Sequence, residues 1–322
     1  MHIIRLDLES LIQQGQISPQ EAARLKGFAL LDQKVSLLIN LLLIFGALSV
    51  AAGTIALVPN PATGLVLALA ALGGAEILRR IDVDASLKVL GAGLTLMGAL
   101  GLAGWIGWEF RESAVSLYPT LAVAGVLGAA AIWFRSPFLV APAVLALGAT
   151  LGSGTGYWHA SYGIFVEEPT LTILMFGAAT GGFYVMRGKV VEAYEGLATI
   201  AARTSLFMVN FAFWVGSLWG DRIGQHWFAP DEWAAREDWQ AQAIDIPDQV
   251  FTLGWAAFLI AMIVKARRGG FLSTLSIVFL SIHFYTQYFE LLGANPGSLV
   301  VGGVILVGLA VGGTRLFRAS RA

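Results

Sequence analysis

The 322-residue chain has no cysteine and only a small share of charged residues. The lack of cysteine excludes disulfide bonds, thiol nucleophiles and thiolate metal sites. Charged residues make up 13% of the chain, hydrophobic residues make up 57%, and the mean hydropathy is +0.73. A soluble domain carries about 25% charged residues. Because lipid accepts apolar surface that a soluble fold of this size would struggle to bury, the composition predicts a membrane protein.

The sequence also lacks the motifs of common enzyme and nucleotide-binding sites. It has no Walker loop, no dinucleotide-binding glycine fingerprint, no His-Glu-x-x-His pair and no nucleophile elbow. No loop carries a dense basic run, which leaves nucleic-acid binding without support. We therefore predict no enzymatic activity, no cofactor, no bound metal and no nucleic-acid partner. A weak divalent-cation site at His159 and His226, near acidic residues of predicted outer loops, is a minor alternative.

Ten hydrophobic stretches approach the length of roughly 20 residues that a helix needs to cross a bilayer. The fifth and the eighth are short, and the fifth could be re-entrant or strongly distorted. The stretches cover about 35–58, 62–78, 88–108, 117–134, 138–152, 169–186, 197–220, 250–264, 271–292 and 298–317.

Basic residues divide sharply between alternate loops. Sixteen of the 20 Lys and Arg fall in the N-terminal segment and in every second loop after it, against Arg111, Arg222 and Arg236 in the other loops. Basic residues accumulate on the cytoplasmic side of membrane proteins. We therefore predict an all-α, polytopic membrane helix bundle of about ten transmembrane helices, with both termini cytoplasmic. Its basic inner face fits contact with anionic membrane lipids.

Residues 1–34 differ from the rest and predict a cytoplasmic helical hairpin ahead of the bundle at 35–322. Leu6, Leu8, Leu11 and Ile12 fit one face of a short helix, and Gly15 is a plausible stop. Ser18-Pro19-Gln20-Glu21 then predicts a second helix that begins with a capping box and proline at its first position. A simple amphipathic lead-in on the inner leaflet is the alternative.

Two further features indicate packing and contact surfaces. Gly98, Gly101, Gly104 and Gly107 recur every third residue in the third stretch, a pattern that lets helix backbones approach closely in lipid. The longest outer loop, near 221–249, is predicted to be periplasmic and holds Trp227, Trp233 and Trp239. Tryptophans here are typical of an interfacial aromatic belt, but the loop is also the best candidate for a lid or a partner contact.

Ionisable groups at membrane depth are costly and therefore suggest function. His283, Gln287 and Glu290 share one face of the ninth stretch, and Arg203, Asn210 and Ser217 recur every seventh residue in the seventh. If the two stripes face each other, they could line one polar path or binding site. Structural hydrogen bonding is the simpler interpretation of both, and Arg203 lies close enough to the inner end to snorkel to the interface.

The segment from Leu11 to Leu25, with its Gly15, Ser18-Pro19 and Glu21, is similar to the opening of a family of predicted bacterial membrane proteins with an N-terminal helical hairpin. That family is known as a domain of unknown function. Residues 288–294 and the Gly-rich last stretch resemble the same group. The resemblance implies a multi-pass protein of the bacterial inner membrane and supplies no catalytic residues. In helix count alone the chain also resembles the drug/metabolite transporter superfamily, but the hairpin and the long outer loop depart from that compact plan.

Two classes of function fit these features. The first is a non-enzymatic accessory or scaffold subunit that binds other membrane proteins, with contacts predicted at Leu11, Ile17, Leu25, Trp227, Trp233 and Trp239. The second is a transporter of a small solute, an ion or a lipid that uses the two polar stripes. A proton-coupled carrier usually holds a carboxylate near mid-membrane, and none is found there, so the first class is favoured. Membrane lipids, other membrane proteins or a second copy of the chain are the expected partners.

Overall fold

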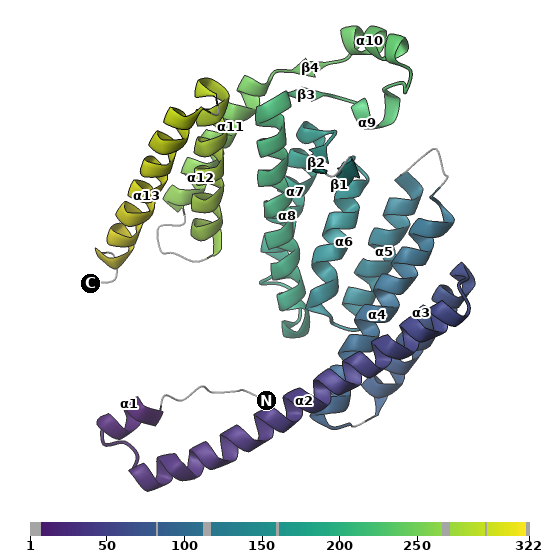
Figure 1. Cartoon of the computed structure of the whole chain (residues 1–322), viewed down its shortest axis with the longest axis vertical. Helices are drawn as coiled ribbons and strands as arrows, with labels where there is room; N and C mark the ends of the chain where they lie inside the picture. Colours follow the sequence, from purple (N-terminus) through teal and green to yellow (C-terminus); the bar gives the residue numbers. More distant parts are fainter. Residues whose placement is uncertain are drawn as a thin grey trace. The chain divides into compact units, whose positions relative to one another are not determined.

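The computed structural model describes residues 8–81, 83–111, 117–158, 161–265, 271–293 and 295–319. Leu6, His159 and Ala294, which belong to features predicted above, lie outside the described residues. Of the described residues, 82% are helical (Figure 1). The elements, in chain order, are α1 Leu8–Gln13, α2 Pro19–Leu57, α3 Pro61–Arg80, α4 Ala85–Glu109, α5 Leu117–Trp133, α6 Pro137–Ala149, β1 Ser153–Trp158, β2 Ser161–Val166, α7 Pro169–Met186, α8 Glu192–Trp219, β3 Asp221–Arg222, α9 Gln225–Phe228, α10 Trp233–Gln242, β4 Asp245–Ile246, α11 Asp248–Lys265, α12 Phe271–Leu292 and α13 Pro296–Ala319.

Each of the ten predicted hydrophobic stretches falls on one of these helices. Among the described residues, six helices are long and apolar enough to cross a membrane: α3, α4, α7, α8, α11 and residues Thr274–Leu292 of α12. Four shorter apolar segments accompany them: Leu41–Leu57, α5, α6 and Pro296–Ile305. The chain is therefore a helical, multi-pass membrane protein, while ten crossings and the side of the termini stay predictions.

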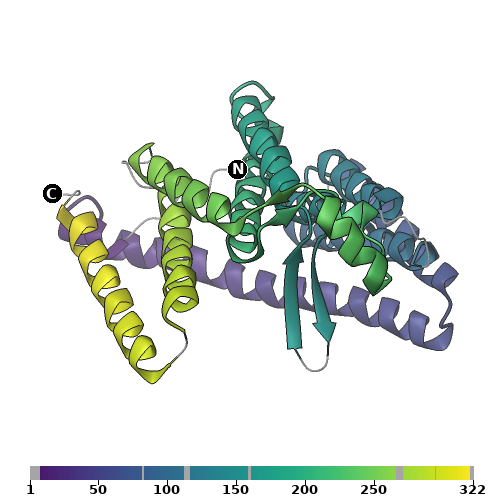
Figure 2. The ribbon, with the colours of Figure 1, turned by 90° about the horizontal axis from the view of Figure 1, so that it is seen from above.

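Two small antiparallel sheets correct the prediction of a purely helical fold. Strands β1 and β2 pair from Ser153↔Val166 to Trp158↔Ser161, and β3 pairs with β4 through two residues each. Figure 2 shows β1 and β2 side by side as a ribbon. Both sheets occupy connections that the hydrophobic pattern treated as plain loops.

The N-terminal segment forms the two predicted helices, but the second helix is longer than predicted. Helix α1 stops before Gly15, whose φ of 69° is readily adopted only by glycine. Ser18 caps α2, and Glu21 completes the capping box by accepting the backbone N–H of Ser18 at 2.9 Å. Helix α2 then runs unbroken for 39 residues to Leu57. The second helix of the predicted hairpin and the first predicted span are thus one helix, with no break at residue 34.

The described chain divides into two compact units. Unit 1 comprises residues 1–114 and 122–143 and is built around the α3–α4 pair. Gly98 lies so close to α3 that an added Cβ would come within 2.8 Å of the Ala68 carbonyl oxygen, and one at Gly101 would come within 3.2 Å of the Ala68 Cβ. An added Cβ at Gly104 or Gly107 would instead meet no atom within 4 Å. Half of the glycine repeat therefore serves helix packing.

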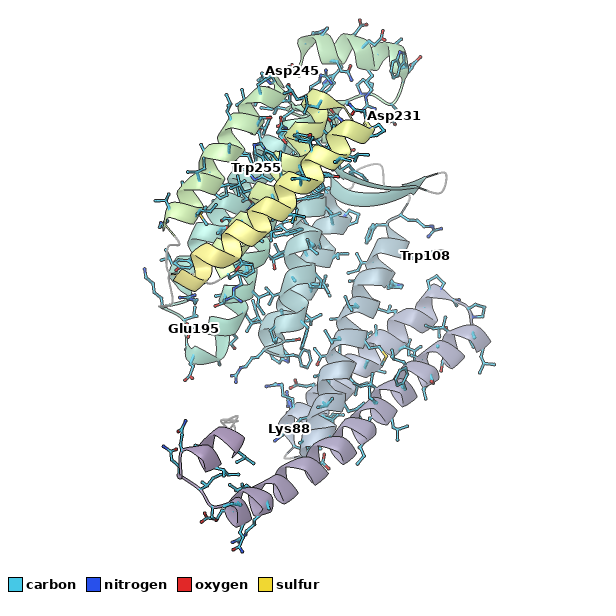
Figure 3. The ribbon with its side chains drawn as sticks, turned by 60° about the vertical axis from the view of Figure 1, so that its left-hand side comes forward. Lys88, Trp108, Glu195, Asp231, Asp245 and Trp255 are labelled. Carbon is cyan, nitrogen blue, oxygen red and sulfur yellow. The ribbon has the colours of Figure 1, made fainter. Side chains whose placement is uncertain are left out.

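Unit 2 comprises residues 115–121 and 144–322, with α8 as its most buried helix. Helix α8 pairs with α7 on one side and with α11 on another, and α11 packs against α12. Trp255 and Leu259 of α11 and Phe279 of α12 form a buried core cluster. In Figure 3, Trp255 lies among the helices of this unit, and Asp231 and Asp245 lie near α10 at one end. We call this end, which carries both sheets and α9–α10, the polar end of unit 2.

Candidate functional site

The structure brings together parts of the two predicted polar stripes. The Gln287 side-chain amide of α12 donates to the Ser217 carbonyl of α8 at 3.4 Å. One turn away, the Trp214 indole N–H of α8 donates to the Thr286 hydroxyl at 3.1 Å. Helices α8 and α12 are therefore linked by polar contacts along the faces that the sequence pattern singled out.

Trp255 of α11 fills the space between the remaining stripe residues. Its indole Nε1 donates to Asn210 Oδ1 at 3.1 Å, and its ring meets the His283 ring edge-on at a centroid distance of 4.8 Å. Trp255 is 0% exposed, and Asn210 and His283 are also buried. The side-chain amide of Asn210 donates a hydrogen bond to the Leu206 carbonyl oxygen at 2.9 Å. We call Asn210, Ser217, Trp255, His283 and Gln287 the polar layer; its centre is occupied by protein.

The outer members of both stripes stand apart from the polar layer. Arg203 is exposed, and its guanidinium lies 4.7 Å from the centre of the Phe271 ring. Glu290 is exposed as well. The charged groups that would make a continuous ion path are therefore not gathered with the buried polar groups.

Within the part of the chain that the structure describes, two buried polar atoms of helices α8 and α12 have no hydrogen-bond partner. These atoms are His283 Nδ1 and Ser205 Oγ. An unpaired polar group in an apolar interior is costly, on the order of 1–3 kcal/mol. Such a group either marks strain in a structural layer or receives a proton or a solute.

A second constellation lies at the polar end, where two buried carboxylates join the start of α7 to the segment that follows α8. Glu168 accepts backbone N–H groups from Gly224 at 2.9 Å and from His226 at 2.8 Å. Asp221 accepts the backbone N–H of Thr170 at 2.8 Å and so caps α7 from the other side. Each carboxylate therefore satisfies backbone donors of the opposite segment. We call this exchange the carboxylate latch.

Burial makes both latch carboxyls weaker acids, so their pKa values lie above the usual ones. Glu168 is 0% exposed and Asp221 is 3% exposed. Burial raises the pKa of Glu168, and the N–H donors of Gly224 and His226 offset part of that rise. Burial likewise raises the pKa of Asp221, opposed by its hydrogen bonds with Thr170. Next to the latch, His226 Nδ1 lies 2.5 Å from Glu167 Oε2.

The latch was not foreseen from the sequence, nor was Trp255. In the sequence, Glu167, Glu168 and Asp221 are three of several acidic residues in the predicted outer loops. The signal that could have found them is a carboxylate directly flanking a span, Glu168 before Pro169 and Asp221 after Trp219. Carboxylates at a helix start are favoured by its exposed N–H groups.

The predicted partner-contact tryptophans lie in α9 and α10, which follow the latch in the chain. Trp233 opens α10 and is 75% exposed, whereas Trp227 and Trp239 are more covered. Helix α10 begins at Trp233 and includes Arg236 and Trp239. Because the latch binds the backbone at 224–226, it fixes the start of the segment that carries these side chains.

The N-terminal contact residues are only partly covered. Leu11 and Ile17 are half-buried in the elbow between α1 and α2, and Leu25 is 46% exposed. Ala22 is the buried residue of this elbow. Part of the apolar surface of Leu11 and Ile17 is therefore covered within the elbow, whereas Leu25 is exposed and could contact a partner.

Among the described residues, no group of three or more His, Asp or Glu side chains is placed to hold a metal ion. Of the two histidines of the suggested cation site, His159 lies outside the described residues, and His226 pairs with Glu167. No protein-family model, curated protein or solved structure matches the chain. The geometry described above is therefore the basis for any functional proposal.

Proposed function

We propose that the chain is a non-enzymatic accessory or scaffold subunit of a bacterial inner membrane, which binds another membrane protein through its α9–α10 segment. The observation that carries this proposal is the exposure of large apolar side chains on that otherwise acidic segment. Trp233 is 75%, Phe228 is 70% and Ile244 is 67% exposed. Tryptophan is enriched at protein interfaces and dominates their binding energy.

The chemistry of the segment defines the partner that fits it. Asp231, Glu232, Glu237 and Asp238 surround Trp233, and Arg236 is the basic residue of α10. A complementary surface would offer an apolar pocket for the indole, rimmed by lysine or arginine. Opposite charges at the rim increase the rate and specificity of association.

The carboxylate latch favours a binding role because it fixes the backbone beneath the aromatic side chains. Ordering a loop on binding costs free energy, so a segment that is already anchored binds more tightly than a free one. Glu168 and Asp221 anchor it at its start, and the β3–β4 pairing of Arg222 with Asp245 closes its base.

The polar layer supports the same proposal by its packing. Trp255 occupies the centre of the layer and hydrogen-bonds with Asn210. Hydrogen bonds between membrane helices stabilise bundles by about 0.6 kcal/mol on average. Such a filled layer is typical of a structural role.

Transport remains the second candidate, on one specific observation. His283 Nδ1 is buried without a hydrogen-bond partner among the described residues. A histidine at membrane depth can bind a proton or a polar solute. Rearrangement of Trp255, whose ring packs against His283, would then be needed to open a path.

The proposed setting is a bundle of ten spans with both termini cytoplasmic and the N-terminal α1–α2 elbow inside. The latch supports this topology because it joins the residues before α7 to those after α8, as expected if both connections lie on one side. The four shorter apolar segments would complete the ten crossings. Membership of the bacterial family with an N-terminal helical hairpin belongs to the same proposal.

A photo-crosslinking amino acid at position 233 tests the proposal in native membranes. We expect a discrete adduct with one membrane protein. The matched control is position 191, where valine is 72% exposed in the turn between α7 and α8, and it should not give that adduct. Adducts with lipid alone at position 233 would identify an aromatic belt and contradict the docking proposal.

A further inference from the structure

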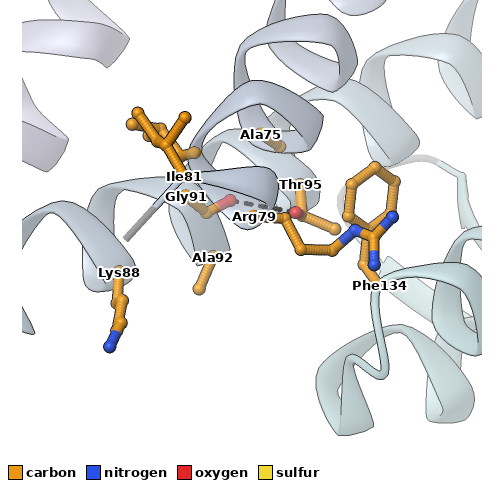
Figure 4. A pocket seen from close by; sticks show the side chains of 9 residues that line it. Ala75, Arg79, Ile81, Lys88, Gly91, Ala92, Thr95 and Phe134 are labelled. Atoms are coloured by element: carbon orange, nitrogen blue, oxygen red, sulfur yellow. Dashed lines mark hydrogen bonds between the residues drawn. The ribbon is translucent and has the colours of Figure 1, made fainter. Parts of the chain in front are cut away.

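A cavity of about 280 Å³ lies in unit 1 at the turn between α3 and α4. Its walls are apolar, formed by Leu78, Ala75 and Ala92 among others, and Phe134 closes one side. Arg79 and Lys88 also line it: in Figure 4 the Arg79 guanidinium lies toward Phe134, whereas Lys88 lies on the other side and points away from it. The cavity thus combines a hydrophobic interior with two cationic side chains.

The position of this cavity along the helices places it at the depth of lipid headgroups. Arg79 lies in the last turn of α3 and Lys88 in the first turn of α4, and both helices are candidate membrane spans. The ends of such spans lie at the boundary between hydrocarbon and water. A ligand in the cavity would therefore meet apolar side chains and cationic side chains close to that boundary.

The cationic side of the cavity is held in place by a carboxylate. Glu76 accepts Arg79 Nε at 2.8 Å and Nη2 at 2.7 Å, and it also accepts Arg80 Nε at 2.6 Å. The Trp133 indole donates to the same carboxylate at 3.0 Å, and the Arg79 guanidinium lies 5.6 Å from the centre of the Trp133 ring. Arg79 is thus pre-positioned beside the cavity.

Positive charge exceeds negative charge around the cavity. Glu76 serves two guanidinium groups, while the exposed Lys88 adds an ammonium. The nearby carboxylate of Asp84 accepts the backbone N–H of Leu87 at 2.8 Å and caps α4. An anion is therefore the complementary ligand, and guanidinium and ammonium groups are the side chains that bind phosphate.

We propose that this cavity binds the phosphodiester headgroup of an anionic phospholipid. Arg79 and Lys88 supply the positive charge at the rim that attracts the phosphate, and the glycerol and the first acyl carbons lie against Leu78 and Ala92. Ligand pockets for whole small molecules measure roughly 300–1,000 Å³. A cavity of about 280 Å³ suits a headgroup whose acyl chains remain in the bilayer. Basic pockets between membrane helices bind acidic lipids in this way.

Native mass spectrometry of the full chain in detergent tests the assignment by titration with phosphatidylglycerol and with phosphatidylcholine of the same chains. We expect tighter binding of phosphatidylglycerol. Lys88→Gln, a change at an exposed rim position, should weaken it about fivefold, the effect of one basic residue near an anionic surface. Ala92→Phe, which fills the cavity without changing charge, should weaken it as well.

The control variant is Lys189→Gln, which removes an exposed lysine from the turn between α7 and α8. It should leave phosphatidylglycerol binding unchanged. Equal losses in Lys88→Gln and Lys189→Gln would show a general charge effect and overturn the site. Millimolar glycerol phosphate or inorganic phosphate that displaces the lipid completely would overturn the assignment to a lipid. A thermal melt equal to that of the parent chain checks that each variant is folded.

Discussion

Replacing Gly98 with alanine tests how closely α3 and α4 approach. A Cβ at this position would lie 2.8 Å from the Ala68 carbonyl oxygen and 2.9 Å from the Leu72 backbone nitrogen. Because both atoms belong to the backbone, the helices must separate to admit the methyl group. Overpacking of this kind costs about 1–3 kcal/mol, whereas alanine gains about 1 kcal/mol over glycine in helix propensity.

Gly104→Ala in the same helix provides the matched control, since nothing lies within 4 Å of its added Cβ. The propensity gain is common to both variants and cancels in their difference. We therefore expect Gly98→Ala to be less stable than Gly104→Ala by about 1–3 kcal/mol. Unfolding by SDS in mixed micelles, followed by circular dichroism, measures this difference. Equal stabilities, or a more stable Gly98→Ala, would refute the close approach of α3 and α4.

Three further outcomes follow from the structure. A double-mutant cycle between Trp255→Phe and Asn210→Ala should give a coupling energy of about 0.6–1.7 kcal/mol in the same assay; zero coupling would contradict their hydrogen bond. Burial raises the pKa of the carboxyls of Glu168 and Asp221, so the folded chain binds their protons more tightly than the unfolded chain does. The free energy of unfolding should therefore fall as the pH rises from the ordinary pKa values, 4.5 for Glu168 and 3.8 for Asp221, through the raised pKa values of the folded chain. Thermal melts of Asp221→Asn should show a weaker dependence of stability on pH. The same dependence in the variant and the parent chain would contradict a raised pKa of Asp221. Because the chain has no cysteine, single cysteines report topology: Asp238→Cys should react with an impermeant maleimide in intact cells and Lys189→Cys only after permeabilisation, whereas equal labelling would contradict the proposed sidedness.

The helices could be predicted from the sequence because their signals are local. A run of apolar residues marks each helix, and Ser18-Pro19 with Glu21 marks the start of α2 within a few residues. Asp84 caps α4 in the same way, by accepting the Leu87 N–H at 2.8 Å. Such signals depend only on neighbours in the chain, so they can be recognised without knowledge of how the helices pack.

The candidate sites could be predicted only in part because they depend on packing. The spacing of Asn210 and Ser217 showed that they share a face, as did that of His283 and Gln287, but not what fills the space between the two helices. Trp255 was missed since no local pattern indicates which helix inserts a side chain there. The latch depends on α7 and α8 lying side by side, which no signal within either helix specifies.

Native mass spectrometry after gentle purification from native membranes can detect whether this chain works as a subunit bound to another membrane protein. We expect a complex heavier than the 34.2 kDa chain by one distinct membrane protein, at fixed stoichiometry. That complex should survive His283→Gln and dissociate in Trp233→Ala. The chain alone, a multiple of its own mass, or a bound solute that disappears in His283→Gln would contradict the claim.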